Sequence, residues 1–432
     1  MTPDSTIVDS AGVTNERKVR DLATLLDITR ALQAEKDLDR LLAIIVEATT
    51  RVMEAERSSL FLLDHEKGYL WSKIAQGAGT TEIRVPIGVG IAGAVARTGE
   101  TVNIPDAYAD PRFNPDVDRR TGFRTRSILC MPLSNHEGKR VGVIQVLNKI
   151  GGTFSRYDED LLCAFGTQAA IAIDNAQLIE HYLEKQRIQA ALGVAREIQL
   201  SLLPKQAPGI AGLEIAGKSV ACDETGGDYY DYLQLDDTHL GIVIGDVSGH
   251  GVGAALLMAT ARATLRAFIE AMDDIRDIFA NLNRLLERDM DAGRFMTMFY
   301  GVLDTSSRRI QFINAGHDAP ILFHRSTGKF ESLDSTALPL GMLEGVSFVE
   351  VGEAVLSPGD LLCLTTDGVW EATNENFEPF GKERLQQLLA EGADLSCAEL
   401  VERVYRAVMA FCGKNEQRDD ITLICIKAAG GK

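Results

Sequence analysis

Residues 226–231 (GGDYYD) and 245–251 (GDVSGHG) enclose the stretch that decides the fold of this chain. Between them, the apolar run 240–244 (LGIVI) has the length and composition of a buried strand. The glycine-rich residues 245–251 lead into small apolar residues (VGAA), which indicates a sharp turn into a helix. Asp228 and Asp246 are therefore expected at the two ends of a hairpin, where a carboxylate at a strand end can hold a cation.

Two other apolar strands in the second half of the chain also carry acids at their ends. Residues 361–368 (LLCLTTDG) end in Asp367-Gly368, and residues 418–426 (RDDITLICI) begin with Asp419 and Asp420. Hard divalent cations such as Mg²⁺ and Mn²⁺ take oxygen ligands and keep several waters, so carboxylates from separate strand ends suit them. The pattern predicts a metal site at these strand ends.

Short segments of the second half, taken in order, resemble the motifs of PPM-type (PP2C-like) protein serine/threonine phosphatases. They are 226–231, 245–251, 297–304 (TMFYGVLD), 314–317 (NAGH), 366–369 (TDGV) and 419–422 (DDIT). The bacterial subfamily that they resemble includes SpoIIE and RsbU. This resemblance implies an αββα sandwich, two Mn²⁺ or Mg²⁺ ions, and hydrolysis of phosphoserine or phosphothreonine by a metal-activated water without a phosphoenzyme.

The resemblance also assigns the site, and the same residues are catalytic and metal-binding: Asp228, Asp246, the main-chain carbonyl of Val247, Asp367 and Asp419. Asp246 would bridge both ions, and Asp228 would bind the second ion directly or through its waters. Asp420 competes with Asp419, although the first acid of the family's pair is the usual ligand. His250 and His317 are expected to hold loops by hydrogen bonds rather than act as general acids. Asp231 and Asp304 are expected to cap turns.

Length and composition describe an ordinary globular chain of 432 residues with 45% hydrophobic and 25% charged residues, enough for two or three domains. The formal charge of −18 argues against nucleic acid or an anionic membrane surface as partner. The seven cysteines show no Cys-x-x-Cys spacing, which favours a reducing cytoplasm. We expect no membrane span, because no apolar run approaches about 18 residues.

The first half resembles a GAF domain. Helical periodicity covers 16–56 with a break at 37–39, strands are predicted at 59–63, 69–75, 82–86, 127–133 and 141–148, and a long helix begins near 157. This order implies a six-stranded antiparallel sheet with helices on one face and a small-molecule pocket on the other. The polar candidates near that pocket are Ser58, Ser59, Asn103, Asp106, Thr125 and Ser127.

Asn148-Lys149, Phe154 and Asp158-Glu159 match the signature of cyclic-nucleotide-binding GAF domains in phosphodiesterases and some cyclases. Two interpretations stay open. Lys149 and Asp158 can pair to fix the loop before the last helix without any ligand. Alternatively, the pocket binds a cyclic nucleotide or another small effector.

Residues 158–203 can form one nearly unbroken helix, because no proline intervenes before Pro204. Ile171, Leu178, Ile188 and Leu192 approximate a 3.5-residue repeat, which predicts a parallel coiled coil and a homodimer. The alternative is a helix packed on its own domain. Residues 195–204 (AREIQLSLLP) also resemble the linker before the catalytic domain of RsbU-like phosphatases.

The catalytic half is predicted to alternate strands with helices, with helices at 252–271, 275–289 and 398–411. The fold class is therefore α+β: a disordered tip (1–15), a GAF sensor domain (16–170), a helical coiled-coil linker (171–204) and a PPM-type αββα phosphatase domain (205–432). The predicted function is a cytoplasmic, metal-dependent protein phosphatase regulated by its GAF domain. By resemblance, its substrate is a phosphorylated anti-anti-sigma (STAS) protein. The alternative is a sensory scaffold that binds this partner without turnover.

Overall fold

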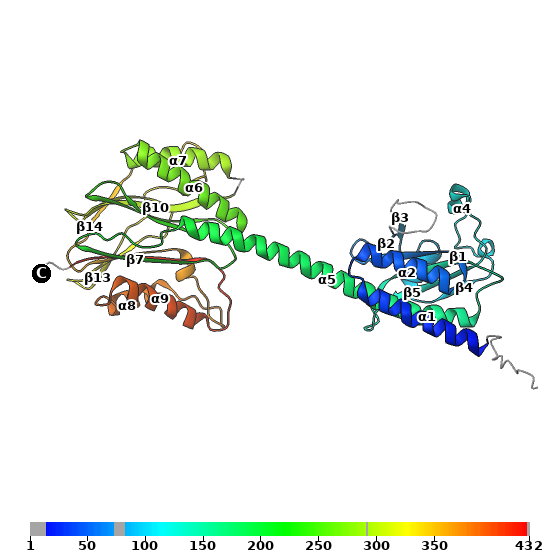
Figure 1. Ribbon diagram of the computed structural model, residues 1–432. Helices are drawn as coiled ribbons and strands as arrows, with labels where there is room; N and C mark the ends of the chain where they lie inside the picture. Colours follow the sequence, from blue (N-terminus) through cyan, green and yellow to red (C-terminus); the bar gives the residue numbers. More distant parts are fainter. Residues whose placement is uncertain (1–13, 73–82, 291–292, 430–432) are drawn as a thin grey trace, which may run out of the picture. The chain divides into compact units, whose positions relative to one another are not determined.

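The computed structural model describes residues 14–72, 83–290 and 293–429 (Figure 1). They belong to two compact units, Met1–Arg187 and Ile188–Lys432. The longest helix, α5 (Arg156–Leu202, 47 residues), contributes to both.

The first unit opens with the two helices that the hydrophobic pattern predicts. They are separated at Glu35–Asp37, two residues before the predicted break at 37–39. Asp37 caps the second of them, because its side chain accepts a hydrogen bond from the main-chain nitrogen of Arg40 at 2.9 Å. The elements before α5 are α1 (Asn15–Ala34), α2 (Leu38–Val52), β1 (Ala55–Asp64), β2 (Tyr69–Ser72), β3 (Ile83–Pro86), α3 (Gly90–Thr98), β4 (Val102–Ile104), η1 (Ala107–Ala109), α4 (Asp116–Thr121), β5 (Ile128–Ser134) and β6 (Arg140–Lys149). The predicted strand at 69–75 and the start of the one at 82–86 extend outside the described residues.

These strands form one antiparallel sheet in the order β3-β2-β1-β6-β5-β4. Apolar residues of α1, α2 and the first part of α5 share one core with one face of the sheet. On the opposite face, α3 closes a smaller core with Phe61 and Leu70. The predicted six-stranded GAF sheet is therefore confirmed.

The second unit contains two five-stranded sheets, in the orders β14-β11-β10-β9-β8 and β13-β12-β15-β16-β7. Its elements after α5 are β7 (Leu213–Val220), β8 (Tyr229–Gln234), β9 (His239–Val247), α6 (Val252–Ala271), α7 (Ile275–Asp289), β10 (Met296–Asp304), β11 (Arg309–Ala315), β12 (Ile321–His324), β13 (Lys329–Ser332), β14 (Gly352–Val355), β15 (Leu361–Thr365), η2 (Asp367–Val369), α8 (Lys382–Glu391), α9 (Cys397–Cys412) and β16 (Ile421–Ala428).

The two sheets pack face to face through a purely apolar layer that includes Ile242, Phe299, Leu362 and Ile424. Helices α6 and α7 cover the outer face of the first sheet, and α8 and α9 cover that of the second (Figure 1). This layering is the αββα sandwich that the resemblance implies.

The composition of helix α6 is more apolar than the sequence analysis expected of any segment. By length and composition alone it is apolar enough to cross a membrane, the single such helix in 14–72, 83–290 and 293–429, so the expectation that no apolar run approaches this length is wrong. In the fold, Ala254, Met258 and Leu265 are buried in the core on the first sheet. Its Arg266 bonds to a buried aspartate of β8. The hydrophobicity of α6 therefore serves core packing.

Candidate metal centre

The carboxylates predicted to bind metal come together at one end of both sheets. Asp228 precedes β8 and Asp246 lies near the end of β9, and these strands pair antiparallel with Tyr229 opposite Gly245. Asp367 follows β15 and Asp419 precedes β16, which pair with Thr365 opposite Leu423. Each sheet thus supplies one acid from a strand end and one from a strand start.

A hydrogen bond between the sheets holds one of these carboxylates. Asp228 is buried, and its Oδ2 accepts from the Oγ1 of Thr366, 2.9 Å away. Thr366 directly precedes Asp367 and is fully buried. The position of Asp228 is therefore tied to the strand that leads to Asp367.

The neighbouring acids Asp419 and Asp420 have different surroundings. Asp420 is buried, and its side chain accepts from the main-chain nitrogens of Cys222 at 2.8 Å, Gly227 at 2.6 Å and Asp228 at 3.3 Å. Asp419 is exposed, and its Oδ1 accepts from the main-chain nitrogen of Asp420. Asp420 thus holds the loop before β8 through main-chain nitrogens, whereas the side chain of Asp419 is exposed just before β16.

Burial, and then the charges of neighbouring acids, raise the pKa values of the carboxyl groups at this end of the sheets. Burial, followed by the charges of Asp367 and Asp419, raises the pKa of Asp246 to about 8. Burial and then the charge of Asp419 raise the pKa of Asp367 to about 6. Burial and the charge of Asp246 raise the pKa of Asp228 well above its usual range. Ionising all of them at neutral pH is costly without a compensating positive charge.

The residues fit a divalent cation by donor chemistry and by space. All the acids offer oxygen, and a Cβ on Gly227 would lie 2.8 Å from the carbonyl oxygen of Val247 and 3.2 Å from Oδ1 of Asp246, so glycine keeps both oxygens accessible. Within 14–72, 83–290 and 293–429, no three His, Cys, Asp or Glu side chains already converge as a finished site. An ion at this place would therefore be held by these acids together with the Val247 carbonyl and water.

The turn after Asp246 is fixed by Ser248. Its main-chain nitrogen donates to the carbonyl of Phe295 at 2.9 Å, and its Oγ accepts from the main-chain nitrogen of Phe295 at 3.0 Å. His250 is exposed on this turn, and its Nδ1 lies 2.8 Å from Oδ2 of Asp223. His317 is buried, and its Nδ1 lies 2.9 Å from Oγ1 of Thr297. Both histidines thus hold loops by hydrogen bonds, as expected.

Asp231 has a role that the sequence did not indicate. It does not cap a turn; it is buried in β8, where Arg266 of α6 donates to both of its oxygens at 2.8 and 2.9 Å. The hydroxyl of Tyr229 donates to the same carboxylate at 2.8 Å. The signal that was missed is the pair Arg262 and Arg266, one turn apart on the apolar helix α6. Asp304 does cap a turn, accepting from the nitrogen of Ser306 at 2.8 Å.

The last turn of α5 contacts the loop before β8. The side-chain amide of Gln199 donates through Nε2 to the carbonyl of Gly226 at 2.5 Å and accepts from its nitrogen through Oε1 at 3.1 Å. A Cβ on Gly226 would lie 2.2 Å from Oδ2 of Asp420, so only glycine fits between these side chains.

In the first unit, the Asn-Lys…Phe…Asp-Glu signature makes structural contacts. Lys149 and Asp158 pair at 2.9 Å with side chains only 9% and 5% exposed, and the nitrogen and Oγ of Ser155 each donate to Asp158 at 2.8 Å. The Nδ2 of Asn148 donates to Glu56 at 2.7 Å. The predicted Lys149–Asp158 pair is therefore present and fixes the loop before α5.

A cavity of about 270 Å³ lies on the α3 side of the sheet, with Arg57, Phe113, Phe123 and Gln145 in its wall. The Arg57 guanidinium lies 4.0 Å from the centre of the Phe123 ring. Ser59 and Thr125 line this cavity as predicted. The other polar candidates bond elsewhere: Ser58 to the carbonyl of Val46, Asn103 to Glu159, Asp106 to the nitrogen of Tyr108, and Ser127 to the nitrogen of Lys149.

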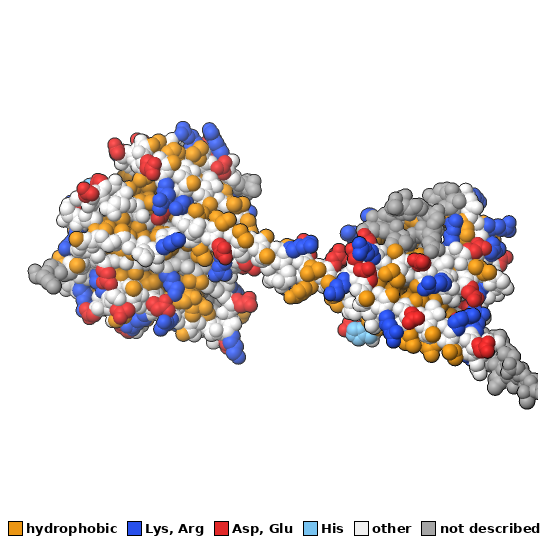
Figure 2. Space-filling view, viewed as in Figure 1, with side chains coloured by type: hydrophobic (Ala, Val, Ile, Leu, Met, Phe, Trp, Pro, Cys, Tyr) orange, Lys and Arg blue, Asp and Glu red, His pale blue; other side chains and the backbone are white. Residues whose placement is uncertain are grey.

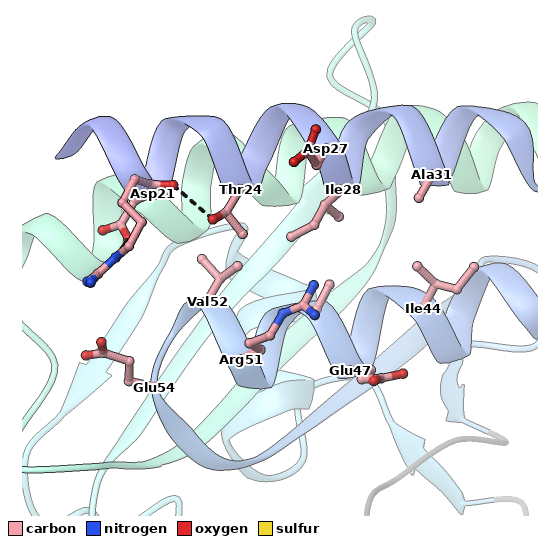
Figure 3. Close-up of a pocket in the computed structure, with 12 residues that line it drawn as sticks. Asp21, Thr24, Asp27, Ile28, Ala31, Ile44, Glu47, Arg51, Val52 and Glu54 are labelled. Atoms are coloured by element: carbon pink, nitrogen blue, oxygen red, sulfur yellow. Dashed lines mark hydrogen bonds and ion pairs between the residues drawn. The ribbon is translucent and has the colours of Figure 1, made fainter. Parts of the chain in front are cut away.

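A second hollow of the first unit lies between α1 and α2 (Figure 3). Ile28 and Arg51 lie between the two helices in Figure 3, and Asp21, Asp27 and Glu47 also line the hollow, so its charges are of both signs. None of the predicted site residues lines this hollow, and its charged side chains do not share one sign.

Comparison with known families agrees with both halves of the fold. The family model of the GAF domain matches residues 37–173, and that of stage II sporulation protein E (SpoIIE) matches residues 236–429. The chain therefore carries a GAF domain followed by a PP2C-like phosphatase domain of the SpoIIE family.

Individual relatives resemble one part of the chain each. The SiaA-PP2C domain of Pseudomonas aeruginosa is 25% identical, with a TM-score of 0.50, and the match covers 56% of this chain and 98% of that one. A cGMP-specific 3′,5′-cyclic phosphodiesterase of Drosophila ananassae is 37% identical over 190 residues, 40% of this chain. The dual 3′,5′-cyclic-AMP and -GMP phosphodiesterase 11A of Takifugu rubripes is 38% identical over 208 residues, 45% of this chain. The chain spans only 16% and 23% of the length of these two phosphodiesterases.

Proposed function

We propose that this protein is a metal-dependent phosphatase that hydrolyses phosphoserine or phosphothreonine on a partner protein. The observation that carries the proposal is the placement of Asp228, Asp246, Asp367 and Asp419 at the same end of both sheets, where burial and the charges of neighbouring acids raise the pKa values of the first three. Two Mn²⁺ or Mg²⁺ ions, held by these carboxylates and the Val247 carbonyl, would supply the positive charge that the cluster needs.

When bound, such ions activate a water as nucleophile and neutralise charge on the phosphoryl group. The chain itself holds the predicted ligands in fixed positions. Thr366 holds Asp228 by its hydroxyl, and Asp420 fixes the loop from Cys222 to Asp228 through main-chain nitrogens. Ser248 keeps the turn after Asp246 against Phe295. These contacts fix the loops and strand ends from which the carboxylates would reach the ions.

Turnover of p-nitrophenyl phosphate and of a phosphoprotein tests the proposal. We expect activity that requires Mn²⁺ or Mg²⁺ and is abolished by a chelator. Asp246→Asn and Asp367→Asn should lower turnover by orders of magnitude while circular dichroism stays unchanged, and Asp304→Asn, at a distant hairpin turn, is the matched control. Undiminished turnover in both site variants would overturn the assignment and favour a non-catalytic scaffold.

The partner proposed here is a phosphorylated STAS-type anti-anti-sigma factor, which the resemblance to SpoIIE and RsbU supports. The surface next to the metal site suits a protein substrate, because Val252 and Leu256 at the start of α6 are 44% and 65% exposed. Phosphate release from purified phosphorylated STAS proteins would test this choice.

A small-molecule effector in the GAF cavity is a second part of the proposal. The enclosed wall of Arg57, Phe113 and Phe123 offers a cation and aromatic faces, which suit an anionic ring compound such as a cyclic nucleotide. Mass spectrometry of small molecules retained by the purified protein tests it, and a cavity that retains and binds none contradicts it.

The proposed homodimer rests on α5. Apolar side chains stand among polar ones along its exposed part (Figure 2), and Leu178, Tyr182 and Ile188 are 61%, 62% and 52% exposed. A second copy would cover them in a coiled coil. Light scattering tests this, since Leu178→Lys should produce a monomer. We also propose a cytoplasmic location, which the free cysteines of the described residues support.

A further inference from the structure

His317 occupies one fixed position at the end of β11. Gly316 turns the chain there with φ of +68°, and a Cβ on it would lie 2.5 Å from Pro339. The main-chain nitrogen of His317 donates to Oδ1 of Asn314 at 2.8 Å, and Nδ2 of Asn314 donates to the carbonyl of Leu333 at 3.2 Å. The imidazole is only 4% exposed. Its direction is therefore set by the surrounding chain.

One side of the imidazole contacts the sheet that carries Asp246. Nδ1 lies 2.9 Å from Oγ1 of Thr297. Thr297 is the residue of β10 directly opposite Asp246 on β9, and side chains of directly opposed residues point to the same face. The imidazole thus supports the immediate neighbour of the carboxylate expected to bridge the metals.

The chain at His317 leads from one sheet to the other. It connects β11 of the first sheet to β12 of the second, and β12 pairs with β15, whose last residue, Thr365, lies two positions before Asp367. Nε2 of His317 is enclosed and has no hydrogen-bond partner among the described residues. Burial lowers the pKa of His317 to about 4, so the ring is neutral at pH 7. A buried, neutral ring therefore lies where the chain crosses between the sheets that carry Asp246 and Asp367.

We propose that His317 is a positioning residue that sets the separation of the two sheets at the metal centre, and with it the distance between Asp246 and Asp367. The inference rests on the proposed metal-dependent function. A neutral ring at this place adds no charge that would repel a cation, and its rigid width resists collapse of the two strands. Residues that support metal ligands in this way typically change metal affinity by about 10–100-fold when they are removed.

Mn²⁺ binding by the full-length protein, followed by the electron paramagnetic resonance signal of the free ion, tests the proposal without relying on activity. His317→Ala should weaken Mn²⁺ binding by about 10–100-fold. Thr297→Val, which removes the hydroxyl at nearly constant volume, should weaken it in the same direction, whereas Thr297→Ser should bind as the wild type does. Thr297 Oγ1 also lies 3.5 Å from the main-chain carbonyl oxygen of Asp246. The double variant His317→Ala/Thr297→Val should therefore weaken binding by less than the two single effects combined, because the two side chains share one contact.

His324→Ala is the matched control. His324 is likewise a histidine paired through Nδ1, here with the buried Asp360 at 3.0 Å, and its Nε2 lies 2.8 Å from Glu331. It is more exposed than His317 and lies on β12, away from the predicted ligands. Its Mn²⁺ affinity should equal that of the wild type. If it weakens as much as His317→Ala, a general loss of stability explains the effect and the proposal is wrong.

Measuring turnover distinguishes a positioning role of His317 from a role in direct proton transfer. At saturating Mn²⁺, His317→Ala should recover most of the wild-type kcat, because the ions restore the ligand arrangement. A large loss of kcat at saturating Mn²⁺ with unchanged Mn²⁺ affinity would overturn the proposal in favour of a general acid. If His317→Ala does not fold, the Mn²⁺ affinity of Thr297→Val is compared with that of Thr297→Ser instead. Absence of Mn²⁺ binding by the wild type overturns the metal centre itself, whereas wild-type affinity in all variants overturns this inference alone.

Discussion

Arg266→Ala should destabilise the phosphatase unit much more than Arg276→Ala. Each arginine bonds to one aspartate through two nitrogens, Arg266 to Asp231 and Arg276 to Asp274. The two pairs differ in burial, because the side chain of Asp231 is 2% exposed and that of Asp274 is 39% exposed.

The burial of Asp231 determines how much unfolding free energy Arg266→Ala should lose. Removing one partner of a buried ion pair costs about 3–5 kcal/mol, because a charge remains buried without compensation. Tyr229 still donates to Asp231 at 2.8 Å and Arg262 lies 3.9 Å away, so we expect the lower limit of about 3 kcal/mol. The exposed pair of Arg276 contributes about 0–1 kcal/mol.

Urea unfolding followed by tryptophan fluorescence measures the difference. The chain has two tryptophans, Trp71 in the first unit and Trp370 in the second. In a Trp71→Phe background, the signal reports the second unit alone. With a slope of about 3 kcal/mol per molar urea, Arg266→Ala should lower the midpoint by about 1 M and Arg276→Ala by less than about 0.3 M.

Equal midpoint shifts for the two variants would refute the reasoning. A further check is Asp231→Asn added to Arg266→Ala. The amide still accepts from Tyr229 but carries no charge, so this double variant should regain part of the lost stability. A double variant less stable than Arg266→Ala would show that the buried charge is not the cause.

Three other predictions concern different parts of the chain. Lys149→Met should lower the stability of the GAF unit by about 3 kcal/mol in thermal unfolding, because it leaves Asp158 buried without its cation; an unchanged transition contradicts this. Glu331 and Asp360 raise the pKa of His324, so its contribution is complete below the unfolded pKa of about 6.5 and is lost as pH rises through the folded value. His324→Gln should therefore lower Tm more at pH 6 than at pH 9, and equal losses would count against it. Inserting one residue near Gly193 rotates the downstream part of α5 by about 100°, whereas seven residues nearly restore the phase. Phosphatase rates should change with the first insertion and recover with the second, and identical rates in both would exclude control through α5.

Local signals predicted the regular elements of the phosphatase unit well. The bounds of α6 and α7 agree with the sequence prediction, since α6 begins after Gly251 and Asp274 caps α7 by accepting from the nitrogen of Arg276. The strands β13 and β14 and the helix α8 were not predicted. The strands have four residues each, and β13 is mostly exposed, so neither produces a clear alternating pattern.

The sequence alone did not predict the roles of residues whose contacts lie far away along the chain. Asp419 and Asp420 are neighbours in one motif, but the oxygens of Asp420 meet main-chain nitrogens about 190 positions earlier, which no local pattern encodes. Asp231 depends in the same way on α6. In the GAF unit, Ser58 and Ser59 alternate across β1, so the strand register alone decides that Ser59 faces the cavity.

The pair of hydrogen bonds between Gln199 and Gly226 decides where the chain can be shortened for study of the phosphatase unit. A fragment that starts after Pro204 keeps every predicted ligand but loses the side chain that pairs with both main-chain groups of Gly226. These groups would then meet water, and the glycine that packs on Asp420 would gain freedom. Such a fragment would hold the loop before β8 less firmly than the intact chain does. A fragment that begins within α5 near Ile188, where the second compact unit starts, keeps Gln199 and this contact.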